Sequence, residues 1–197
     1  MVIPSHLHFA TNTAMIGVMS SIAVSASLDI DEIGLGRAKW LSGLRWGTAV
    51  AGVIGAVVAV AGLLGVDPTN SMGERAAVGG REMLFQVFIE IPIATVLFEE
   101  LAFRGVIASL LERLTSPRRA LLVSSLLFGA WHVSPSSFTS WSGVGGELST
   151  LAATAVAGVG FHLLKRKSGS LVAPMLAHWG TNGVAFIVAW SIVRAVN

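Results

Sequence analysis

The sequence predicts an all-α membrane protein, one polytopic bundle of about six transmembrane helices spanning residues 1–197. Two observations predict this fold class. The chain is 53% hydrophobic and only 12% charged, whereas soluble domains carry about 25% charged residues. Apolar stretches also recur along the chain at close to the length of roughly 20 residues that a spanning helix needs. A length of 197 residues fits a single domain.

Six apolar stretches are expected to span the membrane. The first contains residues 14–26, which faintly resemble a signal peptide, but the first basic residue of the chain is Arg37. Because the positively charged region of a signal peptide is missing, we interpret this stretch as a first membrane span. The predicted spans are 7–27, 44–66, 84–110, 119–137, 147–164 and 171–194.

The second and third spans carry features that predict local geometry. Ala51, Gly55 and Ala59 recur at every fourth position of the second span, a spacing of small residues that lets helices approach closely. Pro92 is expected to make the third span start late, after an interfacial piece that contains Glu82 and Glu90.

The connecting segments are short. Residues 28–43 form a predicted amphipathic surface stretch, and 67–81 and 134–146 are predicted loops. Lys and Arg are distributed unequally among these segments, with nine beside the first, third and fifth loops and only Arg75, Arg81 and Arg194 on the other side. The positive-inside rule therefore predicts that loops one, three and five are cytoplasmic and that both termini lie outside.

The segment FEELAFR (98–104) places three ionisable residues inside the apolar third span. Such residues are costly in a bilayer, usually face the protein interior and often mark function. Glu100 and Arg104 are four residues apart with the acid first, the favourable order for an ion pair. Glu99 lies about 100° further round the helix and has no such local partner. A purely structural ion pair explains Glu100 and Arg104 better than it explains Glu99.

Polar side chains recur on two further apolar helices. LLFGAWH (126–132) ends in His132, and LAHWGTN (176–182) places His178 and Asn182 four apart on one face. At 1.5 Å per residue from the cytoplasmic end of each span, the four side chains lie at similar depths. These depths are about 16 Å for Glu99, 20 Å for His132, 12 Å for His178 and 18 Å for Asn182. The sequence therefore predicts one cavity near mid-membrane.

This set of groups suits hydrolysis by activated water. A carboxylate beside an imidazole can take a proton from water, while a second histidine and a carboxamide supply donors for an oxyanion. Glu99, His132 and His178 could alternatively ligate zinc. The chain has no HExxH or GxSxG motif. It has no cysteine, which excludes disulfides, thiolate metal sites and a cysteine nucleophile.

Other polar and aromatic residues receive simpler interpretations. His162 and the run Lys165 to Lys167 are expected to be an orientation signal that contacts lipid headgroups. Trp131 and Trp179 each adjoin a motif histidine and are candidates for the cavity wall. The formal charge of +2 is small and scattered, so no nucleic-acid partner is expected.

FEELAFRG, FGAWH and LAHWGTN resemble, in order, the EExxxR, FxxxH and HxxxN/D signatures of the CAAX protease and bacteriocin-processing (CPBP, or Abi) family of intramembrane endopeptidases. The resemblance covers about residues 80–192, the catalytic motif core. By motif position, Glu99 and His132 resemble the pair that activates water, and His178 and Asn182 resemble the oxyanion donors. Glu100 and Arg104 resemble a supporting ion pair.

The resemblance implies a multi-pass protein of a prokaryotic cell membrane. Its substrate would be a peptide or protein that enters from the membrane or the cytoplasmic side. The chain is shorter than the eukaryotic prenyl-protein members, so a CAAX substrate does not follow from the resemblance. The family has been described both as metal-dependent and as glutamate-dependent without metal, and both versions stay open here, with zinc as the candidate cofactor.

Two other function classes fit the same residues. A membrane immunity or interaction protein of this family would keep the motifs without proteolysis. A proton- or metal-coupled transporter would use buried Glu and His as a relay. Transporters commonly show internal repeats, and the sequence contains no such repeat.

Overall fold

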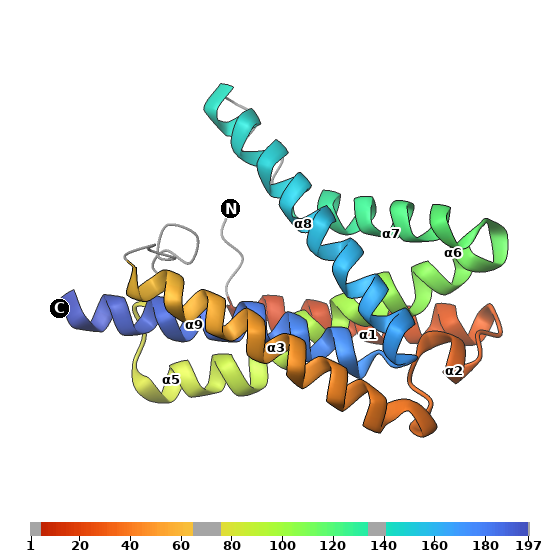
Figure 1. The fold of residues 1–197 in the computed structure, drawn as a ribbon, viewed down its shortest axis with the longest axis horizontal. Coiled ribbons are helices and arrows are strands. Elements are labelled where there is room, and N and C mark those ends of the chain that lie inside the picture. The colour runs from red at the N-terminus through yellow and green to blue at the C-terminus, as the bar shows by residue number, and fades with distance from the viewer. Residues whose placement is uncertain (1–4, 65–75, 134–140, 197) are drawn as a thin grey trace.

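A computed structural model describes residues 5–64, 76–133 and 141–196, and every regular element in these ranges is helical. The helices pack as an elongated bundle from which one end of α8 projects (Figure 1). The elements are α1 (Ser5–Ser25), α2 (Ile30–Ile33), η1 (Arg37–Lys39), α3 (Trp40–Leu63), α5 (Gly80–Phe85), η3 (Gln86–Leu97), η4 (Glu100–Ile107), α6 (Ala108–Leu114), α7 (Pro117–Trp131), α8 (Trp141–Ser168) and α9 (Val172–Val196).

Each of the six predicted spans is mostly helical in its described part, which confirms the predicted fold class. Three described stretches are long and apolar enough to cross a membrane, namely Ile30–Leu63, Gly143–Ser168 and Val172–Ala195. The apolar part of α1, Phe9–Ser25, is shorter, and α7 has 15 residues. Large apolar side chains are exposed along the helices, as on α3 at Val53, Val57 and Leu63. The chain is therefore a multi-pass membrane protein.

Small residues allow α3 to lie against α9. A Cβ at Gly47 would come within 2.9 Å of the carbonyl oxygen of Ala173, and one at Gly180 within 3.0 Å of Ala51. Gly55 continues the stripe toward Val184. The predicted small-residue contact is thus present, but it extends toward the start of α3 and does not include Ala59, which is exposed.

The piece that contains Glu82 and Glu90 is not separated from the third span at Pro92, and where the span enters the membrane stays a prediction. The backbone is helical from Gly80 to Leu114, and Pro92 lies inside η3. η3 has i→i+5 hydrogen bonds, so the missing N–H of Pro92 frees the carbonyl of Val87. The indole Nε1 of Trp179 donates to that carbonyl at 2.8 Å, and this bond replaces the one that the proline removes.

A short segment closes one end of the bundle, because α2 docks against η4, α6, α8 and the turn before α9. The backbone N–H of Leu171 donates to the carbonyl of Gly34 at 2.7 Å. Gly34 has φ 89°, and a Cβ there would lie 2.9 Å from the Leu171 nitrogen, so only glycine fits. The predicted surface stretch 28–43 is accordingly anchored, with Ile33 buried and Ile30 exposed.

Two of the predicted loops lie partly outside the described residues. Of 67–81, residues 76–81 are described, and α5 begins at Gly80. Of 134–146, residues 141–146 already belong to α8, so this part of the loop prediction was wrong.

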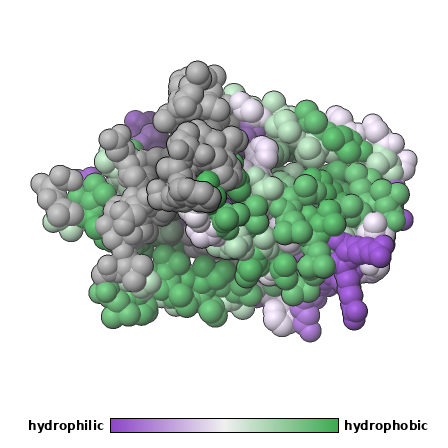
Figure 2. Space-filling view, turned by 90° about the horizontal axis from the view of Figure 1, so that it is seen from above, coloured by the Kyte–Doolittle hydropathy of each residue, from purple (hydrophilic) through white to green (hydrophobic). Residues whose placement is uncertain are grey.

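The connections α1–α3, α6–α7 and α8–α9 lie at the same end of the molecule, the end that carries α2 (Figure 1). Strongly hydrophilic side chains project at this end from an otherwise broadly apolar face (Figure 2). That this end faces the cytoplasm stays a prediction from the distribution of Lys and Arg.

Cysteine labelling of intact cells tests the orientation. The chain has no cysteine of its own, so single cysteines at the exposed positions Gly145 and Lys167 give unambiguous labels. We expect Gly145→Cys to react with an impermeant reagent from outside, and Lys167→Cys to react only after permeabilisation. The reverse pattern would show that the predicted orientation is inverted.

Candidate active site

The two glutamates lie in an irregular part of the third helix. η3 and η4 both have the wide i→i+5 turn, and Glu99 lies at the junction between them. Such turns are rare and occur frequently at functional sites. Every residue from Phe98 to Val106 is buried, so both carboxylates are inside the protein rather than toward lipid.

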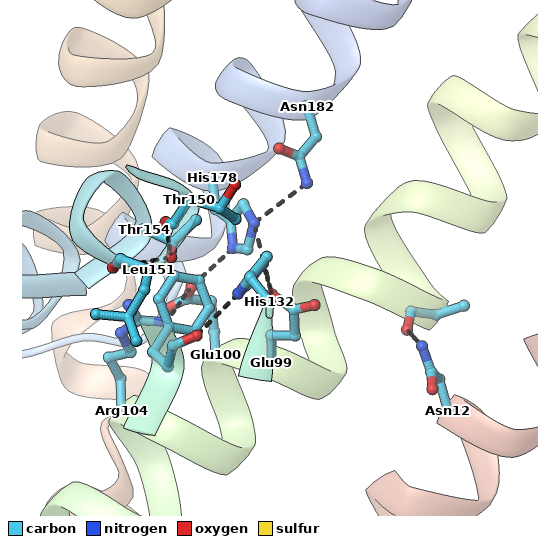
Figure 3. A network of polar contacts seen from close by, with 12 residues as sticks. Asn12, Glu99, Glu100, Arg104, His132, Thr150, Leu151, Thr154, His178 and Asn182 are labelled. Carbon is cyan, nitrogen blue, oxygen red and sulfur yellow. Dashed lines mark hydrogen bonds and ion pairs between the residues drawn. The ribbon is translucent and has the colours of Figure 1, made fainter. Parts of the chain in front are cut away.

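Glu100 connects Arg104 to His178. Its Oε1 lies 3.0 Å from Arg104 Nη1 and 2.8 Å from His178 Nδ1. The Arg104 guanidinium also lies over the ring of Phe128, with Cζ 3.9 Å from the ring centroid, and 5.2 Å from that of Phe161. The predicted pair of Glu100 and Arg104 is present, and it extends to His178 on α9 (Figure 3).

Glu99 has a different environment. Its Oε2 lies 3.8 Å from His132 Nε2 and 3.8 Å from His178 Nε2. Neither distance is a hydrogen bond, and Oε2 has no hydrogen-bond partner among the described residues although the side chain is buried. The structure therefore places two imidazole nitrogens near one buried oxygen of Glu99, at distances longer than a direct hydrogen bond.

His132 caps the carboxyl end of α7 and is the most exposed histidine of the site. Its Nδ1 lies 2.8 Å from the carbonyl oxygen of Phe128. A carbonyl only accepts, so Nδ1 carries the proton and, in the neutral ring, Nε2 presents a lone pair toward Glu99. The side chain of His132 is 29% exposed, against 7% for Glu99, so His132 marks the opening of the site.

The hydrogen bonds of His178 define its tautomer in the same way. Nδ1 donates to Glu100, so the neutral ring has its lone pair on Nε2, where the Asn182 amide donates at 3.2 Å. His178 was expected to donate to an oxyanion together with Asn182. In this tautomer it has no Nε2 proton to donate, whereas the amide of Asn182 has a second N–H.

Phe161 belongs to the site and was missed from the sequence. Its ring stacks on His178 at 5.0 Å between centroids and 21° between planes. No motif marks it, and its only signal is a position beside His162 in GFH (160–162). The two tryptophans expected to line the cavity have different environments. The Trp179 indole donates a hydrogen bond to the carbonyl of Val87, whereas Trp131 is 52% exposed and packs on Phe98.

The expectation that His162 and Lys165 contact lipid headgroups was wrong, because both side chains are buried. Lys165 Nζ donates to the carbonyl of Glu32 at 2.8 Å and to the carbonyl of Arg104 at 2.7 Å. This buried ammonium ties α8 to α2 and to the helix that carries the glutamates. Lys167 is exposed, as expected.

The described residues are not arranged as a metal site. They contain no group of three or more His, Asp or Glu side chains arranged to hold a metal ion. Asn182 Nδ2 also bonds the nitrogen that His178 would have to offer.

The comparisons with known proteins identify the family. The family described as Type II CAAX prenyl endopeptidase Rce1-like matches residues 81–184, a region that holds Glu99, Glu100, Arg104, His132, His178 and Asn182. No curated protein and no solved structure matches the chain. Because the matched region is more than half of the 197 residues, the chain belongs to the Rce1-like type II CAAX prenyl endopeptidase family.

Proposed function

We propose that the protein is an intramembrane endopeptidase that hydrolyses a peptide bond with a water molecule held between Glu99 and His132. The observation that carries the proposal is the buried Glu99 Oε2, which faces two imidazole nitrogens at 3.8 Å. Both Nε2 atoms present lone pairs in the neutral rings, so all three atoms accept hydrogen bonds. A water molecule donates to two of them at about 2.8 Å each and keeps its own lone pair for attack.

The proton transfers follow from this geometry. Glu99 takes a proton from the water as its oxygen attacks the substrate carbonyl, and later gives that proton to the leaving amine. His132 accepts the second hydrogen bond of the water and orients it. The bond from His132 Nδ1 to the Phe128 carbonyl fixes this ring in the tautomer that the role requires.

Asn182 stabilises the tetrahedral oxyanion in this mechanism. Its amide bonds His178 Nε2 at 3.2 Å and keeps a second N–H for the substrate oxygen. Glu100 holds His178 through Nδ1, and Arg104 holds Glu100. Arg104, Glu100 and His178 thus form a supporting chain that positions Asn182. Of these four residues, Asn182 alone contacts the substrate.

The substrate is a peptide or protein that reaches the site from the membrane or the cytoplasmic side. His132 is the exposed member of the site and lies at the end of α7 away from α2, so this opening favours approach of the scissile bond from the membrane. Family membership supports a protein substrate. A prenyl group on that substrate and a prokaryotic cell membrane as its location are further parts of the proposal.

Replacing Asn182 tests the oxyanion role. Asn182→Ala is expected to lower turnover by roughly 10²–10³, the usual effect of removing one oxyanion donor. Thr181→Ala is the matched control on the same helix, since the Thr181 hydroxyl bonds only the carbonyl of Ala177 among its described contacts. Cleavage of a peptide library by purified protein in lipid nanodiscs measures both variants.

Two outcomes would count against the assignment. Asn182→Ala could cleave at the rate of Thr181→Ala, which would remove the amide from the mechanism. A rise in KM with turnover unchanged would instead make Asn182 a substrate-binding residue.

A further inference from the structure

Buried polar atoms without a hydrogen-bond partner are confined to one part of the described structure. Five such side-chain atoms occur in the described residues, and each belongs to a residue no more than 5% exposed. They are Glu99 Oε2, Glu100 Oε2, Arg104 Nη2, Ser125 Oγ and His162 Nε2. Two of these atoms belong to the carboxylates of the candidate site. The other three lie on Arg104, α7 and α8, away from His132.

A glycine lets α8 pack closely against two of these residues. An ideal Cβ at Gly158 on α8 would lie 3.2 Å from Arg104 Nη2 and 3.2 Å from both Cα and Cβ of Ser125. Arg104 and Ser125 therefore both lie against α8 at a position that has no side chain. His162 follows Gly158 by one turn of α8, so its ring continues the same face of the helix.

The line of polar groups continues from His162 to the protein surface. His162 Nδ1 lies 3.4 Å from Ser124 Oγ, and its Nε2 lies 3.5 Å from Glu112 Oε1. The His162 side chain is 1% exposed, whereas that of Glu112 is 36% exposed. Glu112 belongs to α6, at the end of the bundle that carries α2. His162 thus connects a surface carboxylate to the buried groups around Arg104.

Buried polar atoms that have no protein partner are normally bound to ordered water. We propose that a file of water molecules runs between α7 and α8, from Glu112 past His162, Ser125 and Arg104 to the carboxylates of Glu100 and Glu99. The file is a second entrance for water, separate from the opening at His132. Its use as the source of the attacking water rests on the proposed endopeptidase function.

The position of the file gives it a purpose in that reaction. His132 ends α7, and a substrate that reaches Glu99 through this opening covers it. Ser125 lies about two turns earlier on the same helix, so the file reaches Arg104 from the opposite direction. Water therefore remains available to Glu99 while a peptide occupies the site.

X-ray hydroxyl-radical labelling in water enriched in oxygen-18 detects the file without any cleavage. Radicals formed from bound water mark the side chains beside it, even when these are buried. We expect the heavy label on His162 in the wild-type protein in nanodiscs. Phe186 is the control, since it is also buried, at 3% exposed, and its side chain has no polar atom that could bind water. Label on His162 no greater than on Phe186 would overturn the proposal.

Glycine variants test the link to turnover. Gly158→Ala places a methyl group between Arg104 and Ser125, and should lower kcat without raising KM. Gly160→Ala is the matched control on the same helix, because its Cβ meets nothing within 4 Å. Equal kcat in both variants would show that the file does not supply the reaction.

The two experiments separate this inference from the function on which it rests. A labelled His162 in a protein that cleaves no peptide would contradict the proposed function and leave the water file in place. An unlabelled His162 in a protein that cleaves peptides would contradict the water file and support the proposed function. If Gly158→Ala does not fold, the wild-type labelling alone decides.

Discussion

Glu99→Gln is expected to abolish most of the activity while leaving the fold intact. Glutamine keeps the size of the side chain but cannot accept the proton of the attacking water, so turnover should fall by a factor on the order of 10²–10⁴. Glu99 makes no hydrogen bond through Oε2 to another described residue, so the substitution breaks no such contact. Rates of peptide cleavage in nanodiscs and thermal unfolding of the same samples measure the two effects.

Glu82→Gln is the matched control for this variant. Glu82 is exposed on α5, at the start of the same continuous helix, and its removal should change neither cleavage nor unfolding. Undiminished cleavage by Glu99→Gln would end the assignment of Glu99 as the general base. A Glu99→Gln protein that fails to fold would instead assign Glu99 a structural role.

Arg104→Ala is expected to destabilise the folded protein and not only to slow peptide cleavage. The substitution leaves the Glu100 carboxylate buried without its 3.0 Å partner, and breaking a buried pair costs about 3–5 kcal/mol. It also removes the guanidinium that lies over Phe128. We expect a lower folded yield and a lower unfolding temperature in detergent, together with lost activity.

Arg119→Ala is the control for the loss of a positive charge, because Arg119 is exposed near the start of α7. Its unfolding temperature should match that of the wild type. If Arg104→Ala folds as well as Arg119→Ala and only turnover falls, Arg104 takes part in the chemistry and does not merely support Glu100.

Much of the site could be predicted because intramembrane polar residues are costly and must face one another. The four-residue spacings within FEELAFR and LAHWGTN put Glu100 beside Arg104 and His178 beside Asn182, as the structure shows. The estimated depths then predicted that the polar residues of the three helices lie at a similar level in the membrane. These arguments use only helical periodicity and the 1.5 Å rise per residue. They succeed because polar side chains in a bilayer must face the protein interior.

The contacts that were missed depend on tertiary structure. The sequence does not reveal that Glu100, rather than Glu99, bonds His178, because η3 and η4 have wide turns that change which face each residue occupies. Lys165 looked like part of an exposed basic run, but the docking of α2 buries it against the carbonyl of Glu32. That contact joins residues 133 positions apart, a separation that local pattern cannot anticipate.

Cleavage of a peptide library by the purified wild-type protein tests the central claim most directly. The assay is run in lipid nanodiscs, with and without a chelator, beside Glu99→Gln. We predict defined cleavage products from the wild type that persist with the chelator and are lost in Glu99→Gln. Activity that the chelator abolishes and zinc restores would contradict the metal-free mechanism. The absence of any product from folded wild-type protein, across a library that includes prenylated peptides, would contradict the proposed function itself.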